Sequence, residues 1–130
     1  MSTRPHFAPA SVLTNGNMAG NLVSSATVIQ KLSMVGYSLT WSGVTPVGTV
    51  SVQCSNDYSL FPNGKINNPG SWSTLTVLYG GAQVTVVPVT GNTCNGFIDI
   101  DSLSAYAVRL IYTAGSGTGT LQVIVNGKVT

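Results

Sequence analysis

The stretch that decides the fold is YAVRLIYTAGSGTGTLQVIVNGK, residues 106–128. Two segments with alternating apolar and polar residues flank a tract of Gly, Ser and Thr. Alternation with a period of two is typical of a strand that buries one face. A phosphate-binding P-loop would need a Lys after the glycines and a helix behind it, and neither is indicated here. We therefore predict a hairpin loop without a phosphate site.

In this hairpin the apolar side chains of both strands would share one buried face, and a slip of register would expose them. The predicted pairs are Tyr106–Val125, Val108–Val123 and Leu110–Leu121. Arg109 would lie on the opposite face, as would Asp99 of the preceding strand. We expect either a cross-strand Arg109–Asp99 ion pair or an ion pair between subunits that sets their register.

The same alternation recurs along the chain, whereas helical periodicity is nearly absent. It predicts about eight short strands, at 22–32, 35–42, 50–55, 74–79, 82–89, 97–100, 106–113 and 120–126. Turn-forming residues separate them, as in GVTPVG (43–48) and YGGA (79–82). We predict an all-β fold, a single antiparallel β-sandwich or jelly-roll-like domain over 21–130 with Tyr37 and Trp41 in its core.

Residues 1–20 lack this alternation and contain Pro5 and Pro9. We predict that they form an extended N-terminal arm outside the domain, the alternative being a disordered tail. An extended segment with spaced apolar anchors can lie along a neighbour's groove or add to a sheet edge. The predicted inter-subunit contacts are the apolar residues of this arm and the two charged residues named above: Phe7, Val12, Leu13, Met18, Arg109 and Asp99.

The longest segment without periodicity is SNDYSLFPNGKINNPGSW, residues 55–72. Loops of this length are usually functional or lie in an interface. Its aromatic residues Tyr58, Phe61 and Trp72 could stack on the rings of a sugar ligand. In the alternative interpretation, Trp72 pins the loop onto the sandwich.

No arrangement of residues predicts catalysis. The single histidine, His6, lies in the predicted arm, and no G-x-S-x-G motif occurs, so an activated nucleophile is not expected. Asp99 and Asp101 lack the apolar surroundings that raise one carboxyl pKa in a glycosidase. The long loop offers oxygen ligands of the kind calcium binds, without EF-hand spacing, at Asn56, Asp57, Asn63 and Asn67. We predict a non-enzyme without a metal or cofactor.

Charge content narrows the choice of partners. Charged residues make up 6% of the chain, against about 25% in an ordinary domain, and Glu is absent. Such a surface repels its own copies weakly, so it suits a protein that packs against neighbours. The net charge of +2 is spread without a Lys/Arg cluster, which argues against a nucleic-acid partner. No apolar run is long enough to span a membrane.

The two cysteines and the N-terminus indicate where the chain folds. MSTRPHFAPAS has no apolar region of a classical signal peptide, so we expect folding in the cytoplasm. Cys54 and Cys94 are then predicted to be free thiols, with Cys54 buried because it shares the parity of Val50 and Val52. A disulfide is the alternative for a protein that ends up outside cells.

Three parts of the chain resemble small β-sandwich virion proteins of tailed bacteriophages and similar modules of some bacterial surface fibres. They are LTWSGVTPVGTVSVQCSNDYS (39–59), Trp72 and the 106–128 stretch. The resemblance extends over about residues 35–128 and brings no catalytic residues with it. The long 55–72 segment and the N-terminal arm depart from the pattern, so the resemblance leaves open which part of a virion this chain forms.

The resemblance implies a structural role in a virion. The first expectation is a capsid decoration (cement) or head-associated protein that forms a homo-oligomer, preferably a trimer. Its partners would be copies of itself and other virion proteins such as the major capsid protein. The alternative is a tail or fibre component, or an adhesin module, that binds a host-surface carbohydrate.

Overall fold

The computed structural model describes residues 6–29, 34–100 and 105–128, and these residues form only β-strands as regular elements. This confirms the predicted all-β class. The strands are β1 (His6–Asn17), β2 (Leu22–Val23), β3 (Thr27–Val28), β4 (Met34–Ser55), β5 (Ser59–Leu60), β6 (Ile66–Asn68), β7 (Ser73–Thr74), β8 (Val77–Tyr79), β9 (Ala82–Val84), β10 (Val87–Thr90), β11 (Thr93–Ile100) and β12 (Ala107–Lys128).

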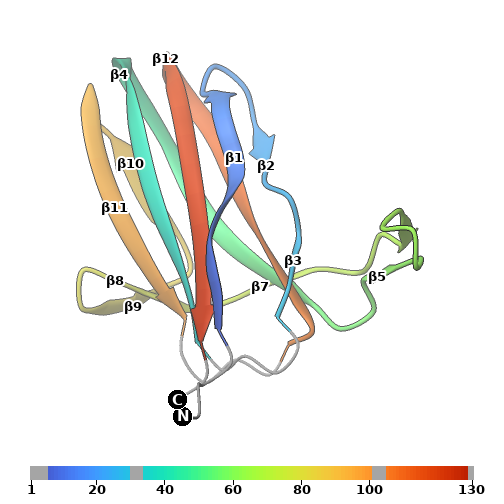
Figure 1. Ribbon diagram of the computed structural model, residues 1–130. Helices are drawn as coiled ribbons and strands as arrows, with labels where there is room; N and C mark the ends of the chain where they lie inside the picture. Colours follow the sequence, from blue (N-terminus) through green and yellow to red (C-terminus); the bar gives the residue numbers. More distant parts are fainter. Residues whose placement is uncertain (1–5, 30–33, 101–104, 129–130) are drawn as a thin grey trace.

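Two strands of 22 residues each, β4 and β12, organise the molecule. They pair antiparallel from Met34↔Lys128 to Ser55↔Ala107 and bend together near their middle (Figure 1). The first layer contains the N-terminal half of β4 and the C-terminal half of β12, in the order β1-β12-β4-β11-β8-β9. The second layer contains the other halves, with β2 and β3 beside β12 and with β7 and β10 beside β4. One continuous sheet thus folds into a sandwich.

The two layers bury one face each against a common core. Its largest fully buried side chains are Tyr37, Tyr112, Met18, Ile29, Leu39, Ile98, Leu110, Leu121, Val35, Val50, Val52 and Val87. The predicted burial of Tyr37, Trp41, Val108, Leu110, Leu121, Val123 and Val125 is confirmed, whereas Tyr106 is half-buried. Burying this apolar surface is the main source of stability in such a domain.

The two predicted loops at 43–48 and in the Gly/Ser tract are instead the bends of β4 and β12. The tracts pair with one another, for example in Thr118↔Val44, so neither is the loop of a hairpin whose own two arms pair. The predicted Leu110–Leu121 hairpin is therefore wrong. Leu110 pairs with Val52 in the second layer, and Leu121 pairs with Trp41 in the first.

Each bend contains a residue with a left-handed backbone conformation, and in each strand the parity of the inward-facing residues changes there. The inward-facing residues of β12 have even numbers up to Tyr112 and odd numbers from Leu121 on, and those of β4 change parity in the same region. Thr45 (φ 43°) and Gly117 (φ 78°) lie within the two bends. Such residues interrupt the alternation of a strand, so each layer keeps its apolar face inward. A Cβ on Gly117 would collide with the Thr45 carbonyl.

The N-terminal segment is an edge strand rather than an arm outside the domain. β1 pairs with β12 from His6↔Lys128, through Phe7↔Gly127, to Asn17↔Thr120. Met18 is fully buried in the core, and Val12 and Leu13 pack against it. The prediction of an external arm is therefore wrong for residues 6–18. Register shifts at three places in β1 explain why its sequence shows no alternation.

The remaining predictions about local structure have mixed outcomes. Gly80 and Gly81 form the tight turn expected between β8 and β9. Cys54 and Cys94 are free thiols. Cys54 is half-buried rather than buried, and burial raises the pKa of its thiol. Asp101 lies outside the described residues.

Candidate interaction site on the projecting hairpin

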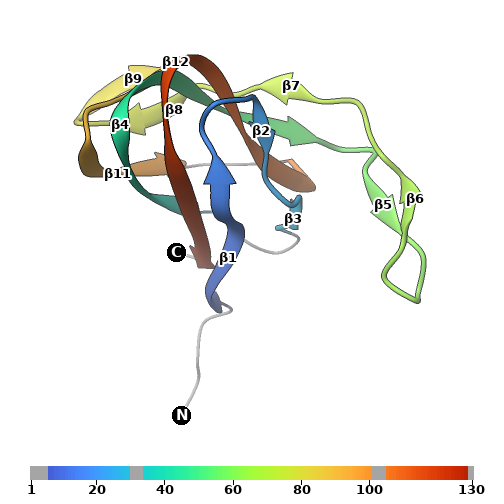
Figure 2. The same cartoon turned by 90° about the horizontal axis from the view of Figure 1, so that it is seen from above.

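The long segment at 55–72 contains a small hairpin that stands away from the sandwich. β5 and β6 form their own two-stranded sheet, and both views show it projecting beyond the second layer (Figures 1 and 2). The Phe61 amide donates to the Lys65 carbonyl at 2.8 Å, and the Gly64 amide donates to the Phe61 carbonyl at 2.9 Å. The hairpin turn is thus defined by its own backbone hydrogen bonds.

A carboxylate ties together the two ends of the projecting segment. Asp57 Oδ1 accepts hydrogen bonds from the Ser71 amide and the Ser55 hydroxyl, both at 2.7 Å. The Ser55 hydroxyl oxygen also accepts from the amide of Tyr58 at 3.2 Å. The bond from the Ser71 amide, followed by that from the Ser55 side chain, lowers the pKa of Asp57 below its ordinary value. The ionised carboxylate therefore holds the base of the hairpin closed.

An aromatic pair and a guanidinium brace this base against the sandwich. The rings of Tyr58 and Trp72 lie 5.7 Å apart with a tilt of 55°. The Arg109 guanidinium carbon lies 4.3 Å from the centre of the Trp72 ring, and Arg109 Nε donates to Gln53 Oε1 at 2.9 Å. Trp72 Nε1 donates to the Pro69 carbonyl at 2.8 Å. These contacts agree with the interpretation in which Trp72 pins the loop onto the domain.

The expected cross-strand pair between Arg109 and Asp99 is wrong. Arg109 is directed to Gln53 and Trp72 in the second layer. Asp99 lies in the first layer, where its neighbours across the strands are Gly36 and Leu78. The two residues therefore belong to different surfaces of the molecule. Asp99 does point outward, as its position between the buried Ile98 and Ile100 requires.

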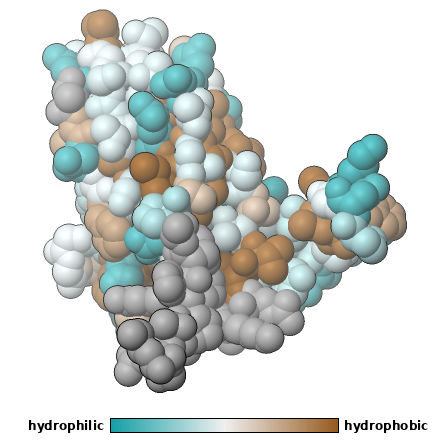
Figure 3. All heavy atoms as spheres, viewed as in Figure 1, coloured by the Kyte–Doolittle hydropathy of each residue, from teal (hydrophilic) through white to brown (hydrophobic). Residues whose placement is uncertain are grey.

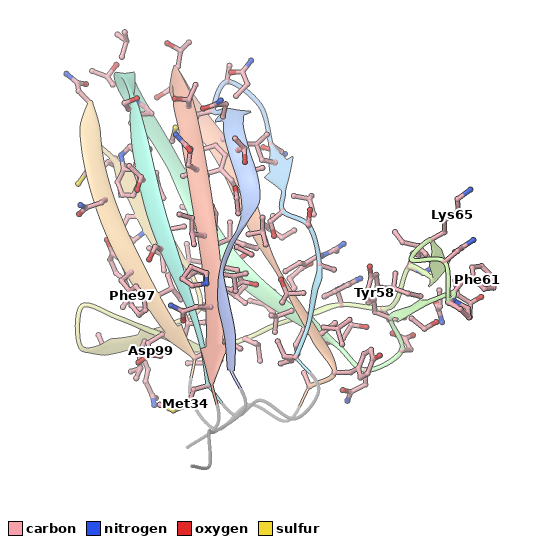
Figure 4. The ribbon with its side chains drawn as sticks, viewed as in Figure 1. Met34, Tyr58, Phe61, Lys65, Phe97 and Asp99 are labelled. Carbon is pink, nitrogen blue, oxygen red and sulfur yellow. The ribbon has the colours of Figure 1, made fainter. Side chains whose placement is uncertain are left out.

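The tip of the hairpin carries an unusual concentration of exposed apolar side chains. Leu60, Phe61 and Ile66 are 43%, 49% and 57% exposed, and Lys65 lies between them in the turn. Phe61 and Lys65 project from the far end of the hairpin (Figure 4), which forms a separate lobe in the space-filling view (Figure 3). Grouped apolar side chains on a projecting element mark a contact surface. We call Leu60, Phe61, Lys65 and Ile66 the tip patch.

Sequence reasoning found only one residue of this patch. It selected the aromatic residues, of which Phe61 is exposed at the tip, while Tyr58 is buried and Trp72 is half-buried in the base. Leu60 and Ile66 were missed because isolated apolar residues in a loop carry no periodic signal. Their grouping around a turn depends on the pairing of Leu60 with Ile66.

Three of the four loop side chains considered for calcium, those of Asn56, Asp57 and Asn63, have structural partners. The Asn56 side-chain oxygen accepts from the Tyr106 amide at 2.9 Å, and that of Asn63 accepts from the Lys65 amide at 3.0 Å. The Asp57 carboxylate accepts hydrogen bonds from Ser55 and Ser71. Within residues 6–29, 34–100 and 105–128, no cluster of three or more His, Cys, Asp or Glu side chains could hold a metal ion. These oxygens shape turns, as Asn and Asp commonly do.

Comparisons with known proteins show the fold. No protein-family model matches the chain, and no curated protein matches its sequence. Among solved structures, the chain is similar to the SPBc2 prophage-derived protein YomS, with a TM-score of 0.62 at 9% sequence identity. The match covers 97% of this chain and 96% of that one, so both share one architecture over nearly their whole length. In the described part of the chain, no helix has the length and apolarity to cross a membrane.

Proposed function

We propose that this chain is a non-enzymatic structural protein of a bacteriophage particle, and specifically a capsid decoration or head-associated protein. The observation that carries the proposal is the architecture it shares, over nearly its full length, with a prophage-derived protein. The low content of charged residues is consistent with a surface that packs against neighbours.

The projecting hairpin favours attachment through protein contacts. Its base is braced by Asp57, Trp72 and Arg109, so the tip patch is presented at a defined position. A pre-ordered apolar tip binds a complementary surface with a small loss of conformational entropy. The alternative, a tail or fibre component that binds carbohydrate, retains only Phe61 as an exposed aromatic of the three considered, because Tyr58 and Trp72 are packed into the base.

The proposal is tested by following the chain into purified particles. We expect it to co-purify with phage particles at a fixed ratio to the major capsid protein, as measured by quantitative mass spectrometry. A reconstruction of the particle would then place it on the head. A few copies confined to the tail would support the alternative, and a chain found only in the soluble fraction would contradict a virion role.

A hairpin variant tests whether the tip is the means of attachment. Residues 59–68 are replaced by a short Gly/Ser linker, which removes the separate β5–β6 sheet and leaves the sandwich ladder intact. We expect a folded protein, by circular dichroism, that no longer enters particles. Val44→Asp is the control, because it replaces an apolar side chain that is 71% exposed at the bend, away from the hairpin, with a charged one. This control should be incorporated normally.

A further inference from the structure

We propose that the tip patch of one copy docks on the outer face of the first layer of a second copy, beside Phe97 and Asp99. This inference rests on the proposed structural role and names a partner within it. Its test uses the purified chain alone, so the failure of one proposal is distinguishable from the failure of the other.

The receiving surface is an apolar pair on the outside of the first layer. Phe97 of β11 and Ile124 of β12 both lie beside Ser38 of β4, one on each side, and are 50% and 43% exposed. The Phe97 ring leans over Gly36, where a Cβ would come within 2.6 Å of it. Asp99 pairs directly with Gly36, so a carboxylate borders the apolar pair. We call Phe97, Asp99 and Ile124 the sheet-face patch.

The two patches are complementary in charge as well as in polarity. Each combines large exposed apolar side chains with one charged group, Lys65 in the tip patch and Asp99 in the sheet-face patch. Asp57 and Arg109 already have partners at the base of the hairpin. A chain with so few charges has few ways to specify an orientation, and the pair of Lys65 and Asp99 provides one.

The positions of the patches require two copies. Phe61 and Lys65 lie on the opposite side of the sandwich from Phe97 and Asp99 (Figure 4). Because the hairpin base is braced against the second layer, the tip is held away from the sheet-face patch of its own chain. Two different surfaces that bind each other make a head-to-tail contact, which gives a closed ring or an open row. The expected trimer would be such a ring.

The contact is tested by exchanging its charges in the full-length purified chain. Lys65→Asp and Asp99→Lys each place like charges in the contact and should weaken self-association about tenfold in sedimentation velocity measurements. The double variant Lys65→Asp/Asp99→Lys restores opposite charges in every contact and should regain most of the wild-type association. A mixture of the two single variants should also regain association, in assemblies where the variants alternate, because the tip patch of each is opposite in charge to the sheet-face patch of the other.

Two substitutions of exposed apolar residues test whether self-association depends on the tip patch in particular. Phe61→Asp should weaken association at least as much as the single charge reversals, because an aromatic anchor is lost from the contact. Val44→Asp, at an apolar position on the bend that is more exposed than Phe61, should leave association unchanged. Circular dichroism and thermal melting verify that each variant is folded.

Several results would overturn the contact. They are a wild-type chain that stays monomeric at every concentration, a double variant no better than the single ones, or a Val44→Asp defect equal to that of Phe61→Asp. A chain that is monomeric in solution but present in particles would refute this contact and leave the structural role standing.

Discussion

Two parts of the chain have similar compositions and opposite structural roles. The paired tracts at 43–48 and 115–120 and the segment at 55–72 are all rich in Gly, Pro, Asn, Ser or Thr. The paired tracts lie inside continuous strands, where each gives the other its hydrogen-bond partner. Within the 55–72 segment, residues 59–68 instead pair with one another and form a small sheet of their own. The comparison teaches that the available partner, rather than composition, decides whether such a tract becomes a bend or a projection.

The largest expected effect is in the long strands on either side of the bend. Leu110→Asp or Val123→Asp places a charge at a fully buried position, which costs several kcal/mol out of a typical stability of about 5–15 kcal/mol. We expect an unfolded or aggregated protein by circular dichroism. Gln122→Asp, an exposed neighbour of Val123, serves as the control and should melt close to the wild type.

The next largest effect concerns the edge strand β1. Met18→Ala removes a fully buried side chain and should lower the free energy of unfolding by about 2–5 kcal/mol. Deleting residues 2–18 should do more, since the pairing of β1 with β12 is lost as well. Chemical denaturation measures both. A truncated chain as stable as the full one would show that these residues are an external arm after all.

A pair of glycine substitutions compares the bend directly with the hairpin. Gly117 and Gly64 both have a positive φ, of 78° and 86°. A Cβ at Gly117 collides with the backbone of Thr45, whereas a Cβ at Gly64 meets nothing within 4 Å. Gly64→Ala should therefore cost about 1 kcal/mol for the backbone conformation alone, and Gly117→Ala clearly more. Equal losses of stability in thermal melts would show that the bend is not tightly paired.

A smaller effect is expected where the hairpin meets the sandwich. Arg109→Ala removes the contact over Trp72 and the hydrogen bond to Gln53, and should cost about 0.5–1 kcal/mol without loss of the fold. Amide hydrogen exchange should rise within 57–71 and stay unchanged in β4 and β12. Arg109→Lys keeps the charge but loses the planar stacking group, so it should give an intermediate result. Unchanged amide exchange in 57–71 would show that the hairpin does not depend on the Arg109 contact for its order.

The smallest effect is a local dependence on pH. Because the pKa of Asp57 is lowered in the folded chain, its contribution is present above the ordinary carboxyl pKa of about 4 and is lost as the pH falls through the lowered value. We expect the Ser71 amide to lose its hydrogen-bonded chemical shift over that acidic range. Asp57→Asn should remove this transition. A transition that persists in Asp57→Asn would assign it to another carboxyl group.

The sequence by itself determined the all-β class and the inward-facing residues of the long strands. Alternation is a local property, since successive side chains of any strand point to opposite faces, and it identified Leu110, Val123 and Tyr37 correctly. The sequence also correctly predicted the tight turn at 79–82, because two adjacent glycines favour a turn. Of the tip patch, it selected only Phe61.

Only the tertiary structure decided which strands pair and which segments project. Pairing joins residues far apart in sequence, so a Gly/Ser tract could be read as the turn of a local hairpin, although β12 continues through it along β4. Bulges removed the alternation of β1 and concealed its place at the sheet edge. The outer Phe97–Ile124 pair and the tip patch exist because distant strands lie side by side. Such contacts are fixed by burial of the common core, a property of the whole chain that no local pattern contains.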